Sequence, residues 1–154
     1  MGTYICQVLM AMAGSFGFAL LFQTRGKKVM IASVCGGLIW AFYLFLYEKT
    51  ANDTVAYFFA TISAAIVAEV LARILKTPAI TLLVTILIPL VPGGTLYYTM
   101  SSLLRGDTVV FAQCLDRLVP EAGAIAIGII FTASVVQIIT KCIYYMQNWK
   151  KWKR

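Results

Sequence analysis

The 154-residue chain is 61% hydrophobic and only 12% charged, with a mean hydropathy of +0.86. Soluble domains are about 45–50% apolar and about 25% charged, so this composition excludes an ordinary soluble protein and indicates an integral membrane protein. The net charge of +7 does not indicate nucleic-acid binding, because the 13 Lys and Arg residues lie in short turns and a C-terminal tail and form no basic face interleaved with aromatic residues.

Five apolar segments approach the ~20 residues that a helix needs to cross the hydrocarbon core of a membrane. They predict one all-α transmembrane domain over residues 1–154, a bundle of five helices with a basic tail at 147–154. The predicted spans are residues 4–22, 29–47, 54–75, 78–104 and 119–146. The first span is not expected to be a cleaved signal peptide, because no basic residue precedes it and a second span follows almost at once.

Basic residues predict the orientation, because cytoplasmic loops carry an excess of Lys and Arg. Most of them fall in the first and third turns and the tail, which share one side of a five-span topology, whereas most acidic residues fall on the other side. We therefore predict a plasma-membrane protein with its N-terminus outside and its C-terminus in the cytoplasm. Aromatic residues are expected to anchor the outer interface at Trp40, Tyr43, Tyr47 and Tyr57, and the inner one at Tyr144, Tyr145, Trp149 and Trp152.

The residues and motifs of common enzymes are missing from the sequence. There is no His, the commonest general base and metal ligand, and no Walker loop, HExxH or GxSxG motif. The four Cys residues have no CxxC spacing, and metal and redox sites need clustered sulfurs. We expect no enzymatic activity, no metal site and no cofactor.

The third predicted span carries two ridges at a spacing of four residues, which places each ridge on one side of a helix. The first ridge consists of Ala60, Ala64, Ala68 and Ala72. The second, about 100° around the helix, consists of Thr61, Ala65, Glu69 and Arg73. Small side chains allow a neighbouring helix to approach closely, so the alanine ridge predicts a packing face. Other small-residue faces are predicted at residues 14–17, 36–37 and 122–128.

Glu69 and Arg73 form a candidate ion or charge pathway. They lie four residues apart and so can pair on one helix face, and Glu69 lies about 10 Å inward from Lys76 at ~1.5 Å per residue. An ionisable residue within the membrane costs about 2.5–3.5 kcal/mol on insertion scales and usually faces the bundle interior or water. The pair either lines a pathway for substrate or ions, or neutralises itself near the interface with Arg73 reaching the headgroups.

The fourth predicted span is broken by the motif IPLVPGGTLYY, residues 88–98. Non-helical backbone at membrane depth is tolerated only where it is buried in protein or lines a wet cavity. A half-helix that begins at Gly93 and Gly94, with Thr95 as a cap, offers unpaired N–H groups and a positive dipole end to a carboxylate. The alternative is a proline kink that improves packing. The predicted substrate-binding residues are Pro89, Pro92, Gly93, Gly94, Thr95, Tyr97 and Tyr98.

The segment ARILKTPAITLLVTILIPLVPGGTLYYTM, residues 72–100, together with GFALLF at 17–22 and the five-span length, resembles the threonine/serine exporter family, in particular its YjjB-type small membrane subunit. The resemblance implies a secondary exporter of small amino acids such as threonine and serine, or of dicarboxylates such as succinate. It also implies a larger five-span partner subunit with a cytoplasmic domain. The positions that match the family motif are Arg73, Pro78, Pro89, Pro92, Gly93, Gly94 and Tyr97.

Three functions remain open from the sequence. The first is a membrane subunit of an ion-driven secondary exporter for a small amino or carboxylic acid, embedded in the lipid bilayer and assembled with the larger partner or with itself. The second is a non-transporting subunit that stabilises a membrane complex. The third is a small homo-oligomeric channel.

Overall fold

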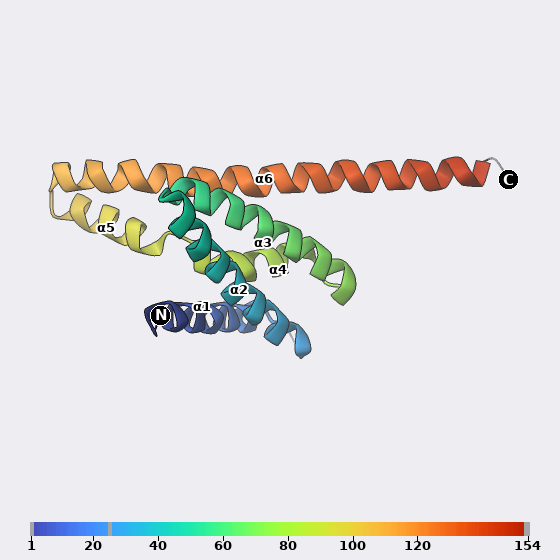
Figure 1. The fold of residues 1–154 in the computed structure, drawn as a ribbon, viewed down its shortest axis with the longest axis horizontal. Helices are drawn as coiled ribbons and strands as arrows, with labels where there is room; N and C mark the ends of the chain where they lie inside the picture. The colour runs from blue at the N-terminus through green and yellow to red at the C-terminus, as the bar shows by residue number, and fades with distance from the viewer. Residues whose placement is uncertain (1, 25, 153–154) are drawn as a thin grey trace.

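The protein is described by a computed structural model that covers residues 2–24 and 26–152. All regular structure in these residues is helical, which confirms the predicted all-α fold (Figure 1). The helices are α1 (Gly2–Leu21), α2 (Lys27–Thr50), α3 (Asp53–Leu75), α4 (Ala79–Leu87), the 3-10 helix η1 (Ile88–Leu90), α5 (Gly93–Leu104) and α6 (Thr108–Trp152).

Four helices of the described chain are long and apolar enough to cross a membrane. They are α1, α2, α3 and the Thr108–Ile143 part of α6. The segments Ala79–Leu90 and Gly93–Leu104 pass the same test only together, and they are bent by 65° at the short break between them. The residues of the predicted fourth span thus form two helical segments that meet at an angle.

Glycines bring α1 and α2 close together, since a glycine has no side chain to separate the two backbones. Gly36 lies against the side chain of Ser15, and Gly37 also lies against α1, so a Cβ atom at either position would clash. The predicted close packing at 36–37 is therefore confirmed. Gly14 and Gly17 instead face open space, so within the predicted face at 14–17 the close contact with α2 is made by the buried Ser15 and not by the two glycines.

The alanine ridge of α3 packs as predicted, and the second ridge packs against a different neighbour. The alanine ridge is buried, with exposed fractions of 0–7%, in one core cluster with Leu82, Ile86 and Leu90 of α4 and η1. The second ridge faces α6, because Thr61 contacts the position of Gly128 and the Arg73 side chain donates to Thr140 at 3.0 Å. α3 therefore joins the first half of the broken span to the last helix.

The break itself follows from the residues at 89–93. Pro89 and Pro92 have no N–H to donate to the carbonyls one turn back. The carbonyl of Ile88 accepts instead from the Val91 N–H at 3.2 Å, and Val91, in extended conformation, accepts from the Gly93 N–H at 2.7 Å. These hydrogen bonds give partners to some of the backbone groups at the break. The chain changes direction there and continues into α5.

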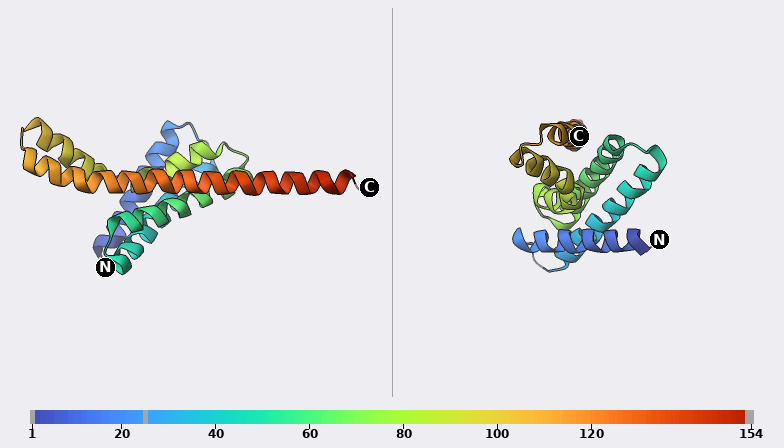
Figure 2. Two further views of the ribbon diagram at one scale, coloured as in Figure 1. Left: turned by 90° about the horizontal axis from the view of Figure 1, so that it is seen from above. Right: turned by 90° about the vertical axis from the view of Figure 1, so that its left-hand side faces the viewer.

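A tight turn then reverses the chain from α5 into α6. Gly106 has a φ of 73°, and the Asp107 carboxylate accepts from the Val110 N–H at 3.2 Å, which caps the start of α6. The segment 105–118, expected as an outer turn, is therefore mostly helical. α6 has 45 residues and so is about 68 Å long at ~1.5 Å per residue, and it contains Pro120 without a break. Figure 2 shows α6 extending as a straight rod well past the other helices.

Candidate functional site

The motif at residues 93–98 opens onto a groove between α5 and the first turns of α6. The groove has a volume of about 590 Å³ and a mixed polar and apolar lining. Its lining residues are Gly94, Thr95 and Tyr98 of α5 and Gln113, Cys114, Asp116 and Arg117 of α6. The groove therefore brings the broken span together with charged residues from a helix that follows it in the chain.

The N-terminus of α5 offers hydrogen-bond donors to this groove. The Gly93 N–H is occupied by Val91, and the Leu96 N–H donates to the Pro92 carbonyl at 3.0 Å. The N–H groups of Gly94 and Thr95 lie in the first turn, where a helix has no acceptor for them. A Cβ atom built on Gly94 would meet no atom within 4 Å, so a ligand can approach this end closely. Such an N-terminus favours an anionic group.

Glu121 of α6 lies behind this N-terminus. Its side chain is only 6% exposed, and its carboxyl oxygen Oε2 is buried without a hydrogen-bond partner. The Thr95 hydroxyl lies beside the carboxyl group, and Asp53 and Arg117 act on it electrostatically. A buried carboxylate without a close cation is costly, so a group of this kind is expected to bind a proton or a cation.

A polar cluster, made of Tyr43, Asp53, Tyr57 and Glu121, continues from this point into the bundle. Tyr57 of α3 interacts electrostatically with Glu121, and its ring lies 4.6 Å from that of Tyr43. The Tyr43 hydroxyl donates to Asp53 Oδ1 at 2.9 Å. Both tyrosines are 7% exposed, so their hydroxyl groups lie largely away from solvent. Helices α2, α3, α5 and α6 thus all contribute to the polar surroundings of the groove.

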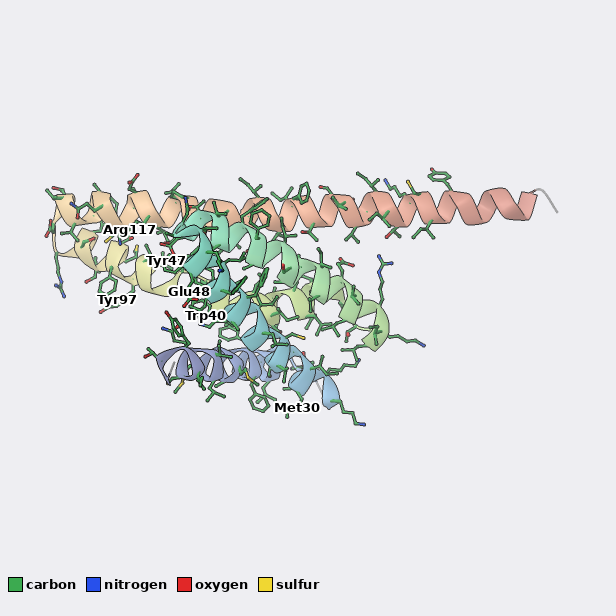
Figure 3. All side chains as sticks on the ribbon, viewed as in Figure 1. Met30, Trp40, Tyr47, Glu48, Tyr97 and Arg117 are labelled. Carbon is green, nitrogen blue, oxygen red and sulfur yellow. The ribbon has the colours of Figure 1, made fainter. Side chains whose placement is uncertain are left out.

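The structure gathers only some of the predicted substrate-binding residues at the groove. Gly94, Thr95 and Tyr98 line it, and Gly93 is the first residue of α5. Pro92 is the N-cap of α5, whereas Pro89 packs in the bundle, 3.7 Å from the Cβ position of Gly36. Tyr97 is 67% exposed and points away from α6 (Figure 3).

Glu69 and Arg73 lie in a different place. They line a small cavity of about 190 Å³ between α3 and the later part of α6, together with Ile66, Val70, Val136 and Ile139. This cavity shares no lining residue with the α5–α6 groove. Arg73 ties the two helices together through Thr140, while Glu69 is partly exposed. The two candidate sites of the sequence are therefore separate sites in the fold.

Sequence reasoning missed the contribution of α6 to the groove. Gln113, Asp116 and Arg117 fell in a segment expected as an outer turn, and Glu121 counted only toward the charge of the outer side. One signal was present in the sequence: Glu121 follows the first two residues of the predicted fifth span, so an acid stands inside an apolar helix. The same argument had singled out Glu69.

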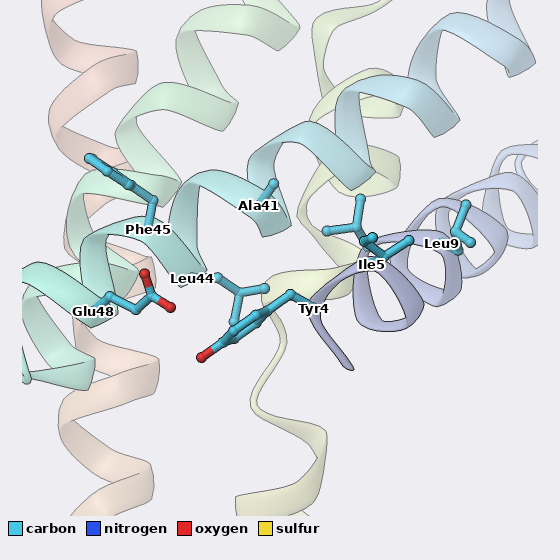
Figure 4. Close-up of a pocket in the computed structure, with 8 residues that line it drawn as sticks. Tyr4, Ile5, Leu9, Ala41, Leu44, Phe45 and Glu48 are labelled. Atoms are coloured by element: carbon cyan, nitrogen blue, oxygen red, sulfur yellow. The ribbon is translucent and has the colours of Figure 1, made fainter. Parts of the chain in front are cut away.

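A second groove, of about 370 Å³, lies between α1 and α2 (Figure 4). Its lining is mostly apolar, with Ile5, Leu9 and Leu44 among the residues, and the hydroxyl of Tyr4 interacts with Glu48 at its edge. The lining includes no basic side chain, and its one charged residue is the acidic Glu48. This groove is therefore less suited to a carboxylate than the groove between α5 and α6.

A family model described as "Threonine/Serine exporter, ThrE" matches residues 7–135, which include the broken span, the groove and Glu121. The chain belongs to the threonine/serine exporter family. This match confirms the resemblance in the sequence. Neither a curated protein nor a solved structure matches the chain. As a member of the threonine/serine exporter family, which is a family of transporters and not an enzyme class, the chain is a multi-pass membrane protein of amino-acid export.

The described residues of this family member contain no group of three or more side chains that could hold a metal ion. The four cysteines are free, and Cys114 alone lies at the groove. The groups that the groove offers to a ligand are backbone donors, one guanidinium, one amide, two hydroxyls and one carboxylate, with Glu121 behind them.

Proposed function

We propose that this chain is the membrane subunit of a secondary exporter for small amino acids such as threonine and serine, or for related small carboxylates. In this proposal the bent pair of α4–η1 and α5 crosses the membrane as one broken span, the fourth of five. The observation that carries the proposal is the open N-terminus of α5, whose residues Gly94 and Thr95 line a groove with charged side chains.

The groove can hold both ends of an amino acid. The substrate carboxylate accepts hydrogen bonds from the Gly94 and Thr95 N–H groups, and Arg117 adds a positive charge on the facing helix. The Asp116 carboxylate is placed to bind an ammonium group, and Gln113 to bind a hydroxyl. A substrate with these three groups is a small hydroxy amino acid, whereas a dicarboxylate would use the N-terminus and Arg117 alone.

The substrate pathway needs more protein than this chain. The groove is open to the surface along one side, and α5 presents Leu96, Met100 and Leu104 as exposed residues. Transporters commonly enclose a midplane site between two related repeats. We therefore propose that a larger five-span subunit with a cytoplasmic domain, or a second copy of this chain, closes the groove.

The change Gly94→Ala tests the proposed site. A methyl group at this position meets no atom of the chain, so we expect normal insertion, but it stands between the α5 N-terminus and the ligand. Loss of one charge-assisted hydrogen bond corresponds to about tenfold weaker transport. The measurement is threonine efflux from cells that express the chain with and without its partner.

The control for this test is Gly17→Ala, which also adds a methyl group in open space but on α1. We expect unchanged efflux in this control. Normal efflux in Gly94→Ala would instead favour a non-transporting assembly subunit, in which the break is structural. A small homo-oligomeric channel would conduct ions without any second chain, which purified protein in planar bilayers tests.

Glu69 and Arg73 remain a proposed charge pathway at the other end of α3. The change Glu69→Gln removes the charge and keeps the size of the side chain. We expect reduced threonine efflux with normal amounts of protein in the membrane if the pathway passes this cavity. Unchanged efflux would leave the pair a structural contact between α3 and α6.

A further inference from the structure

The proposed binding mode leaves Glu121 without a role. It does not line the groove, yet it lies directly behind Thr95, and its Oε2 atom is buried and unpartnered. A carboxyl group with a free, buried oxygen beside a helix N-terminus is placed to interact with the same positive end as the substrate. The inference below rests on the proposed carboxylate site at that end.

The neighbouring groups determine the electrostatic environment of the Glu121 carboxyl group. Asp53 and Tyr57 face it from α3, Thr95 faces it from α5, and Arg117 precedes it by one turn on α6. Asp53 already accepts a hydrogen bond from Tyr43, so it adds negative charge to the cluster. Arg117 is exposed and hence screened by solvent, which weakens its effect on a buried group.

We propose that Glu121 is the proton-binding residue of the transport site, and that its charge sets the affinity of the α5 N-terminus for the substrate carboxylate. When Glu121 is ionised, it accepts from Thr95 and competes with the substrate for the positive end of α5. When it takes up a proton, no negative charge remains behind Thr95, and the N-terminus binds the substrate carboxylate.

This arrangement makes proton binding and carboxylate binding favour each other. Such coupling is reciprocal, so a bound substrate also strengthens the binding of the proton.

A ligand-free measurement tests the proton-binding part on the full chain in lipid nanodiscs. The amide NMR signals of Gly94 and Thr95 are expected to shift with pH in the wild type and to stay constant in Glu121→Gln. The matched control is Asp116→Asn, which removes an exposed carboxylate of the same groove and is expected to keep the titration. Signals that do not titrate in the wild type, or that still titrate in Glu121→Gln, would overturn the proposal.

A binding measurement tests the coupling. Between about pH 5 and pH 7 threonine keeps its own charges, so any change in its Kd reports on the protein. We expect the wild type to bind threonine up to about tenfold more tightly for each unit that the pH falls, the limit for one linked proton. Glu121→Gln is expected to bind at every pH as tightly as the wild type does at low pH, and Glu121→Asp to keep the pH dependence.

The outcomes separate this inference from the proposed function. Binding by the wild type that weakens as the pH falls, and that loses this dependence in Glu121→Gln, would overturn the coupling and make Glu121 a competitor site for the substrate ammonium. An equal pH dependence in wild type and Glu121→Gln would also overturn it. Failure of threonine and succinate to bind the wild type at any pH would contradict the proposed function, while the amide titration still decides whether Glu121 binds the proton.

Discussion

Two carboxylates inside apolar helices, Glu69 and Glu121, have different surroundings in the fold. Glu69 is partly exposed on the face of α3 that carries Arg73, whereas Glu121 is buried beside Thr95 and has one unpartnered oxygen. The sequence analysis singled out Glu69 because it lies well inside a predicted span, with Arg73 four positions later. Glu121 also has a basic residue four positions away, Arg117, but it lies at the start of its predicted span, and its contacts with α3 and α5 come from far away in the chain. Contacts between residues that are distant in the chain cannot be predicted from the spacing of residues within one helix.

At the scale of single residues, Gly36 gives a test of packing that is independent of transport. The change Gly36→Ala places a methyl group on the buried side chain of Ser15. Overpacking of this kind costs about 1–3 kcal/mol, so we expect a lower Tm in detergent. Gly14→Ala is the matched control, since it adds the same group in open space. Equal thermal stability of the two variants would contradict the close approach of α1 and α2.

At the scale of elements, the residues at 89–94 explain why the helix ends between η1 and α5. Two prolines and two glycines within six residues cannot continue a helix, whatever surrounds them. The 65° bend and the direction of α5 were not predictable, because they depend on the packing of α5 against α6. The extension of α6 back to Thr108 was missed for the same reason.

The bend itself can be tested with the double change Pro89→Ala and Pro92→Ala. Both carbonyls one turn back then regain a donor, and alanine favours a continuous helix. We expect the two half-helices to straighten, which lengthens the distance between spin labels at the exposed positions Ile80 and Leu104. An unchanged distance between the labels would mean that packing against α6, and not the prolines, sets the angle. Efflux is expected to fall, because the open N-terminus of α5 is lost.

At the scale of the whole molecule, composition was sufficient to predict an all-helical membrane protein, and the family match agrees with it. The spans α1 to α3 lie close to their predicted bounds, because each is a single apolar run between polar turns. The inner aromatic anchors were predicted at Tyr144, Tyr145, Trp149 and Trp152, and apart from Tyr145 their side chains lie outside the described residues. The orientation in the membrane stays a prediction from the basic residues.

Reporter fusions test this orientation. The excess of Lys and Arg in the first turn, the third turn and the tail favours the cytoplasmic side for all three. We therefore expect a fluorescent protein fused to the C-terminus to fluoresce, and alkaline phosphatase at the same position to be inactive. Phosphatase fused into the turn at 105–107 is expected to be active. The reverse pattern would invert the topology and place the groove on the cytoplasmic half.

The length of α6 has a mechanical consequence. One unbroken helix carries Glu121 behind the groove and Thr140 at the contact with Arg73, about 29 Å apart along its axis at ~1.5 Å per residue. A continuous helix can tilt as a rigid body, so a movement at one end is accompanied by a movement at the other. A change of charge at Glu121 that tilts α6 would thus move Thr140 relative to Arg73. The groove at α5 and the cavity at Glu69 and Arg73 are therefore mechanically coupled through α6.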